Sequence, residues 1–111
     1  MTISENWNKL CQILGEKYKK DVDLTHILYL IGIQEYGKGF QQFTKEEKME
    51  LIHLGACVML SRKGFYKKMG VDERNFPLYE RIAFMAQLSV IEETNLLKEA
   101  AIEYFKEIEI L

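Results

Sequence analysis

The sequence predicts a single, mainly α-helical domain that spans residues 1 to 111. We expect a small bundle of about four helices, with a short β-hairpin or irregular insertion near residues 65 to 82. Two observations lead to this prediction. A chain of 111 residues, 48% of them hydrophobic, has the size and the apolar content of one domain with its own core. Apolar residues recur every three or four positions along most of the chain, and cap residues divide these stretches into helices.

The first two helices follow from cap residues and apolar spacing. Ser4 is a suitable N-cap for a helix that runs to about residue 20, with these apolar positions on one face: Trp7, Leu10, Cys11, Leu14 and Tyr18. Asp23 can cap a second helix over residues 24 to 36. That helix is apolar on nearly every side, so we expect it to be buried.

The segment Gly37-Lys38-Gly39 joins the second helix to a third. A phosphate-binding P-loop needs GxxxxGK followed by serine or threonine, between a strand and a helix, and this segment meets neither condition. A glycine just past the end of a helix is the usual residue for a left-handed C-cap. We therefore interpret the segment as a structural connection, and expect Phe40 and Phe43 to hold it against the core.

The third helix begins with a capping box. The Thr44 hydroxyl can accept the backbone N–H of Glu47, whose carboxylate reaches back, so a helix is predicted over residues 45 to about 63. Gly32 and Gly55 have no side chains beyond hydrogen, which allows two helices to approach closely at these positions. The second and third helices are therefore expected to cross there, as antiparallel neighbours.

The rest of the chain predicts a hairpin and a last helix. Residues 65 to 88 contain two short aromatic runs around the polar turn at residues 72 to 75, and Pro77 would place the second run on an edge strand. Ser89 forms another capping box with Glu92. The helix that follows carries a seam at alternating spacings of four and three: Val90, Thr94, Leu97, Ala101, Tyr104, Ile108 and Leu111.

Three segments resemble a family of small helical bacterial proteins with no assigned function. They are GKGFQQFTKEEKMELIHLGACVML, GFYKKMGVDERNFP and SVIEETNLLKEAAIEYF, which together cover most of the chain. The resemblance implies the same helical fold. It carries no catalytic residues over to this sequence.

One polar stripe on the third helix is the candidate for chemistry. Its members share a face on a helical wheel: Glu46, Glu50, His53, Cys57 and Ser61. Glu50 and His53 form an ExxH pair, which helical di-metal carboxylate proteins use twice, with further glutamates. His26 lies in a DxxH pair at the start of the second helix, so Glu50, His53 and His26 are the candidate ligands of a divalent metal. The alternative is that both histidines lie at the margin of the core while the glutamates face water.

Cys57 lies four residues after His53 and presents a second chemical hypothesis. A neighbouring imidazolium lowers the pKa of a thiol, so the two residues could form a thiolate pair. A buried structural cysteine is the competing interpretation, and no third residue to orient the histidine is visible. The sequence contains no strong catalytic motif, so we expect a protein that is not an enzyme.

The last helix is the candidate for contact with a partner. Apolar residues beyond the seam widen its apolar surface, and the positions expected at an interface are Leu97, Ile102, Tyr104 and Phe105. Three glutamates, Glu99, Glu103 and Glu107, would border that surface as a solvated ridge. The sequence therefore predicts a homodimer, or contact with another protein.

Charge and composition exclude other classes of protein. The net charge of −2 argues against a general nucleic-acid binder, although a basic patch surrounds Phe65 and Tyr66: Arg62, Lys63, Lys67 and Lys68. Interleaved lysines and aromatics can bind bases, or can equally cover the edge of a core. No apolar run is long enough for a membrane span, the amino terminus does not resemble a signal peptide, and the two cysteines form no CxxC pair.

The sequence therefore predicts a cytoplasmic, non-catalytic interaction module that associates with itself. The alternative is a small metal-binding or enzymatic protein that uses Glu50 and His53, with His26. No cofactor is expected beyond a divalent metal in that alternative. No small-molecule ligand is indicated by any motif.

Overall fold

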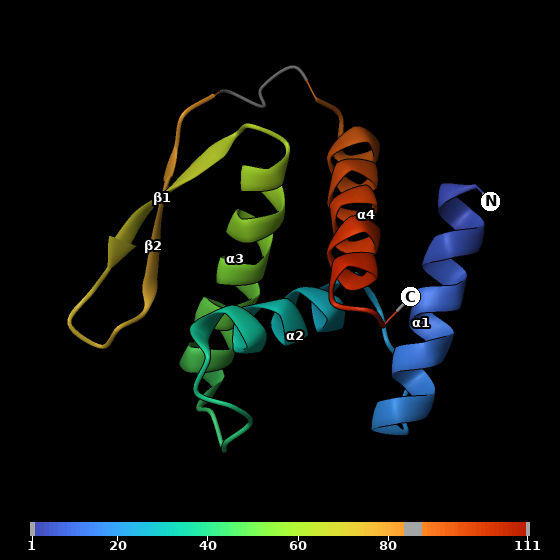
Figure 1. The fold of residues 1–111 in the computed structure, drawn as a ribbon, viewed down its shortest axis with the longest axis horizontal. Helices are drawn as coiled ribbons and strands as arrows, with labels where there is room; N and C mark the ends of the chain where they lie inside the picture. Colours follow the sequence, from blue (N-terminus) through green and yellow to red (C-terminus); the bar gives the residue numbers. More distant parts are fainter. Residues whose placement is uncertain (1, 84–87, 111) are drawn as a thin grey trace.

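The computed structural model describes residues 2 to 83 and 88 to 110 (Figure 1). The elements in order are α1 (Ile3–Tyr18), α2 (Leu24–Tyr36), α3 (Lys45–Arg62), β1 (Tyr66–Val71), β2 (Pro77–Arg81) and α4 (Val90–Glu107). The predicted fold class, a mainly helical domain with a hairpin before the last helix, is confirmed. Leu111, the last position of the predicted seam, lies outside the described residues. In the described part of the chain, no helix has the length and hydropathy needed to cross a membrane.

Helix α1 is displaced by about two residues from its predicted bounds. Its N-cap is Thr2, whose hydroxyl accepts the backbone N–H of Glu5 at 3.1 Å, so Ser4 lies inside the first turn instead of capping it. Both residues are good caps, and the choice of Thr2 places Glu5 where its carboxylate also accepts the Thr2 hydroxyl. The helix ends at Tyr18 because Lys19 adopts the left-handed conformation, with φ of 56°.

Helices α2 and α3 meet backbone to backbone. A Cβ atom placed on Gly32 would lie 2.0 Å from the carbonyl oxygen of Leu51, and one on Gly55 would lie 2.0 Å from that of Leu28. The predicted close crossing at the two glycines is confirmed. Leu28 meets Gly55 and Gly32 meets Leu51, so the paired positions run in opposite directions and the helices are antiparallel neighbours, as predicted. Their axes are inclined to each other, and α2 runs across the lower ends of α3 and α4 (Figure 1). Two glycines that face backbone allow such a crossing, because no side chains hold the helix axes apart.

The connection between α2 and α3 is structural, as predicted. Gly37 has φ of 79°, and its backbone N–H donates to the carbonyl of Ile33 at 3.1 Å. Phe43 is buried against Ile33 and Leu51. Phe40 is not buried: its side chain is 64% exposed, so the expectation that it packs on the core is wrong. The capping box of Thr44 and Glu47 begins α3 as predicted.

Strands β1 and β2 form an antiparallel hairpin that packs on α3. Its turn is held by Asp72, whose Oδ1 accepts the backbone N–H of Arg74 at 2.8 Å and of Phe76 at 3.0 Å. Asn75 has φ of 65°, a conformation that asparagine tolerates better than most residues. The predicted hairpin is confirmed, with Pro77 at the start of β2.

Helix α4 lies between α1 and α3 and contacts both (Figure 1). Its capping box is present: the N–H of Glu92 donates to the Ser89 hydroxyl, and the N–H of Ser89 donates to the Glu92 carboxylate. All four helices contribute to one main core, which includes Leu10, Ile27, Ile31, Met59, Ala100 and Ala101. Because α4 is covered on two sides, most of its apolar surface is used within the chain.

Candidate functional site

The predicted stripe on α3 lines a small crevice between α3 and the hairpin. The crevice has a volume of about 220 Å³, and Glu50, His53, Cys57, Arg74 and Tyr79 are among its lining residues. The guanidinium of Arg74 donates to the carboxylate of Glu50 and to that of Asp72, each at 3.0 Å. These two carboxylates raise the pKa of Arg74 further above its usual value. Glu50 therefore already has a cationic partner, and serves to hold the hairpin turn against α3.

Cys57 and His53 come together in this crevice. The Sγ atom of Cys57 lies 3.5 Å from Nε2 of His53, as the i,i+4 spacing predicted. The cysteine is only 4% exposed, and burial raises the pKa of its thiol above the ordinary value of 9.0. At neutral pH the group is therefore a thiol, not a thiolate. A nucleophilic cysteine needs a lowered pKa, so this geometry favours the structural interpretation.

His26 does not join Glu50 and His53. It lies on the first turn of α2 and lines a different pocket. Among residues 2 to 83 and 88 to 110, no three histidine, cysteine or acidic side chains gather as a group that could hold a metal ion. The proposed metal ligands thus lack the geometry that the two sequence pairs suggested, since similar spacing on two helices does not bring the pairs together.

The positions expected to contact a partner on α4 belong to the core. All four are buried within the single chain: Leu97, Ile102, Tyr104 and Phe105. The side chains of Ile102 and Phe105 are each 5% exposed. Ile102 and Phe105, which were expected to widen the exposed apolar surface of this helix, are instead buried, because α1 and α3 pack on opposite sides of it (Figure 1). The Tyr104 hydroxyl donates to the carboxylate of Glu35 at 3.2 Å, which ties α4 to α2.

The predicted glutamate ridge and basic patch neutralise each other. Lys63 Nζ donates to Glu99 at 2.9 Å and to Glu103 at 3.0 Å, and Arg62 forms a hydrogen bond with Glu107. The glutamates are therefore ion-pair partners of the end of α3, not a free solvated ridge. Of the four basic residues in the predicted patch, two are used to join α3 to α4, which weakens the case for nucleic-acid binding.

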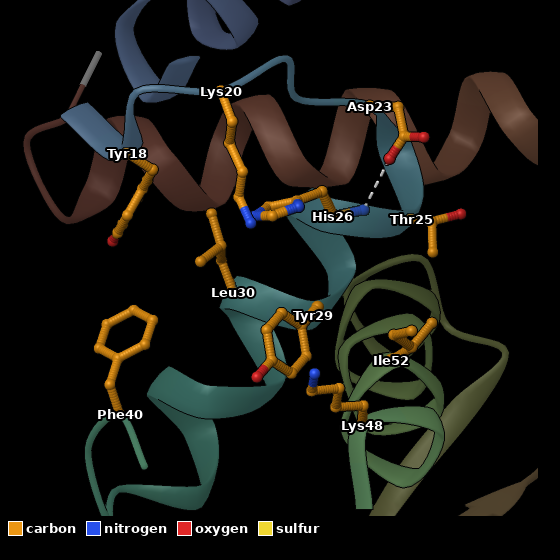
Figure 2. A pocket seen from close by; sticks show the side chains of 10 residues that line it. All are labelled: Tyr18, Lys20, Asp23, Thr25, His26, Tyr29, Leu30, Phe40, Lys48 and Ile52. Atoms are coloured by element: carbon orange, nitrogen blue, oxygen red, sulfur yellow. Dashed lines mark hydrogen bonds between the residues drawn. The ribbon is translucent and has the colours of Figure 1, made fainter. Parts of the chain in front are cut away.

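A cavity among the described residues surrounds His26, and we call it the His26 pocket. Its volume is about 650 Å³. It lies where the end of α1, the start of α2, the connection after α2 and one face of α3 meet (Figure 2). The lining residues are Tyr18, Lys20, Asp23, Thr25, His26, Tyr29, Leu30, Phe40, Lys48 and Ile52.

Aromatic rings form two sides of the His26 pocket. Tyr18 and Phe40 lie with ring centroids 5.8 Å apart and planes tilted by 48°. Across the pocket, the Tyr29 ring meets the His26 ring edge to face at 6.1 Å (Figure 2). The exposed Phe40 is thus not an isolated surface residue, because it stands over Tyr18 at the pocket mouth.

The charged groups of the His26 pocket are mostly basic. Lys20 comes from the segment between α1 and α2, Lys48 comes from α3, and neither forms an ion pair with an acidic side chain that the structure describes. The single acidic residue, Asp23, caps α2: its Oδ1 accepts the backbone N–H of His26 at 2.9 Å (Figure 2). The pocket therefore presents two ammonium groups against one carboxylate that is already hydrogen bonded.

His26 is held in its neutral form. Burial lowers the pKa of its imidazole below 6.5, nearby Lys20 lowers it further, and Asp23 opposes the change. A neutral imidazole at pH 7 carries one ring N–H donor and one acceptor nitrogen. His26 can therefore form a hydrogen bond with a ligand of either polarity, and gains a proton most readily when an anion is close.

No family model, curated protein or solved structure matches this chain. The resemblance to small helical bacterial proteins therefore stays a prediction, and the site is argued from this chain alone. Of the pocket residues, sequence reasoning proposed a binding role only for His26, and assigned it to a metal. The others come from four separate segments, so no spacing marks them. The one available signal was Phe40, a large apolar residue in a short polar connection.

Proposed function

We propose that this protein is a non-catalytic binding module that holds a small molecule in the His26 pocket. The pocket itself carries the proposal. Ligand sites in proteins are concave, measure roughly 300 to 1,000 Å³, and combine apolar walls with a few polar groups. A volume of about 650 Å³, with aromatic walls and the basic groups of Lys20 and Lys48, fits that description.

Two observations support binding over catalysis. The thiol of Cys57 is buried and neutral, and it lies in the crevice under the hairpin instead of in the pocket. Within the pocket, the carboxylate of Asp23 is used as the cap of α2, so it is not poised as a general base. Among the residues that the structure describes, no carboxylate is hydrogen bonded to the His26 ring, so His26 gives the pocket a hydrogen-bonding group and no activated nucleophile.

Ligand mapping by NMR tests the proposal. A fragment library is titrated into ¹⁵N-labelled protein, and hits are expected to shift amide signals around residues 25, 26, 29 and 48. Thr25→Trp places a large ring in the pocket and should abolish these shifts. Met49→Trp, at an exposed position of α3 that does not line this pocket, is the matched control. A library with no hit on these amides would refute the binding function.

We also propose self-association, now through the hairpin. Met69, Val71 and Leu78 are exposed apolar residues on a sheet that has two strands in the described chain. A sheet edge without a neighbouring strand is a template for pairing with another chain. A second copy of this protein would bury these side chains and extend the sheet. Light scattering coupled to size exclusion measures the mass directly, and a particle of 13.1 kDa at all concentrations would refute the association.

A cytoplasmic location completes the proposal. Cys11 and Cys57 are both free, as expected for a protein kept in a reducing compartment. Fractionation of the cells that make the protein, with detection by antibody, tests this location. Recovery from the membrane or secreted fraction would contradict it.

A further inference from the structure

We propose that the ligand of the His26 pocket is a planar aromatic molecule that carries one phosphate or carboxylate group. This inference rests on the proposed binding function and assigns its ligand a chemical class. It follows from the separate positions of the aromatic and the basic side chains, and from the acidic group that is already engaged.

The aromatic part of the ligand is assigned to the mouth formed by Tyr18 and Phe40. Gly37 and Gly39, with φ of 79° and 72°, turn the connection so that Phe40 stands over Tyr18. A phenyl ring that stays 64% exposed leaves a large apolar surface in water. Aromatic rings attract other rings in tilted and offset arrangements, beyond the gain from burial alone. A flat ring that enters the mouth would cover Phe40 and contact Tyr18 or Tyr29, which an aliphatic chain does less well.

The anionic part is assigned to the space between Lys20 and Lys48. Figure 2 shows the two ammonium groups pointing into the pocket from different sides, Lys20 beside His26 and Lys48 beside Tyr29. Lysine binds phosphate and carboxylate as a point charge with several N–H donors. A cationic ligand would be repelled by both groups. A neutral ligand would leave them without a charged partner.

The remaining polar groups agree with this assignment. The charged or titratable groups around His26 are Lys20, Lys48, Asp23, Tyr18 and Tyr29. Asp23 already accepts the backbone N–H of His26, so it opposes an incoming anion less than a free carboxylate would. The imidazole of His26 can donate its ring N–H to the anion. Because a nearby anion favours the charged imidazolium, binding should also become tighter as the pH falls.

The inference is tested by calorimetric titration with matched probes. The phosphate arm compares adenosine monophosphate with adenosine and with inorganic phosphate. The carboxylate arm compares 2-naphthoate with 2-naphthamide and with acetate. In at least one arm, the aromatic anion is expected to bind more tightly than either matched probe by about tenfold or more. This is the ratio expected when a hydrogen bond to a charged group is gained. The arm that responds identifies the anionic group.

Variants separate the two halves of the pocket. Lys20→Gln and Lys48→Gln should each weaken the anionic probe by about tenfold, and leave the neutral aromatic probe unchanged. Phe40→Ala should weaken both aromatic probes by a similar factor. Lys45→Gln, an exposed lysine on the first turn of α3 that does not line the pocket, is the control for charge. Each of these residues lies at the surface, and far-ultraviolet circular dichroism confirms that each variant is folded.

The outcomes distinguish the inference from the proposed function. If neutral and anionic aromatics bind equally well at the mapped amides, the ligand class is wrong and the binding function stands. If neither probe arm binds but library fragments do, the ligand class is again wrong and the binding function again stands. If a single-stranded oligonucleotide binds far more tightly than adenosine monophosphate, the pocket belongs to a nucleic-acid surface and the inference is overturned. If no molecule perturbs the pocket, the binding function itself falls.

Discussion

The α-hydrogen side of Gly32 faces the backbone of Leu51 so closely that a Cβ atom there would lie 2.0 Å from the leucine carbonyl oxygen. Gly55 has the same relationship with Leu28. In both cases the neighbour is backbone, so no side-chain rotation can make room. The two contacts fix how α2 crosses α3, and α2 carries His26 and Tyr29 while α3 carries Lys48. The crossing therefore determines the width of the His26 pocket.

Gly32→Ala and Gly55→Ala should each destabilise the protein by about 3 kcal/mol, because an added methyl group must push the two helices apart. Urea denaturation followed by circular dichroism measures the free energy of unfolding. Met49→Ala, on an exposed position of α3, should change it by no more than about 0.5 kcal/mol. Glycine variants as stable as the wild type would show that the helices do not meet at these positions.

The capping boxes make a second, smaller contribution. Thr44→Ala and Ser89→Ala each remove the hydroxyl that accepts a backbone N–H in the first turn, from Glu47 and Glu92 respectively. Each should cost about 1 kcal/mol of unfolding free energy. Thr44→Ser keeps the hydroxyl and is the matched control. An alanine variant that unfolds at the wild-type urea concentration would contradict a capping role for that residue.

The parts of the structure that the sequence predicted are those determined by neighbours in the chain. Caps such as Thr44 and Ser89, and the apolar spacing along each helix, are local, so the helices and the hairpin were placed within a few residues. The choice of Thr2 over Ser4 was not resolved, since either can cap. Ile102 was expected at an interface and is buried in the core, because its burial depends on which helices cover α4.

The candidate site was harder to predict for the same reason. The ExxH spacing correctly placed Glu50 and His53 on one face of α3. It could not predict that Arg74, from the hairpin, pairs with Glu50. The His26 pocket joins Tyr18, Lys48 and Phe40 across connections of different length. No periodicity links such residues, because they meet only through the packing of α1, α2, α3 and the connection after α2.

His26 makes stability depend on pH. Its pKa is lowered in the folded protein, chiefly by burial, so the unfolded chain binds more protons between the folded-state pKa and about 6.5. The contribution of His26 to the free energy of unfolding is therefore most favourable above pH 6.5, and it becomes less favourable as the pH drops through that window. His26→Gln should remove this part of the dependence. Urea denaturation at pH 7.5 and at pH 5.5 compares the two proteins. An equal loss of stability in both would assign the dependence to other groups.

Cys57 should react slowly with iodoacetamide at pH 7.5, because its thiol is buried and its pKa is raised. A Cys11→Ser background leaves Cys57 as the single cysteine, and mass spectrometry follows the alkylation. In urea the same protein should react at the rate of an ordinary free thiol, which serves as the control. Reaction faster than that rate in the native protein would instead indicate a thiolate paired with His53, and would revive the enzymatic alternative.

The two possible positions of a dimer interface give opposite results when a charge is introduced. Ile102→Glu and Phe105→Glu place a carboxylate in the core, so each should unfold the subunit, with a loss of several kcal/mol (about 3 or more). Leu78→Glu lies on the exposed hairpin and should leave the fold intact while it lowers the mass in light scattering toward 13.1 kDa. Met49→Glu, an exposed apolar position on α3, controls for added charge and should leave the mass unchanged. If Leu78→Glu keeps the wild-type mass, the hairpin is not the interface. If Ile102→Glu stays folded but the dimer dissociates, α4 forms the dimer contact, and Ile102 does not belong to the core of a single chain.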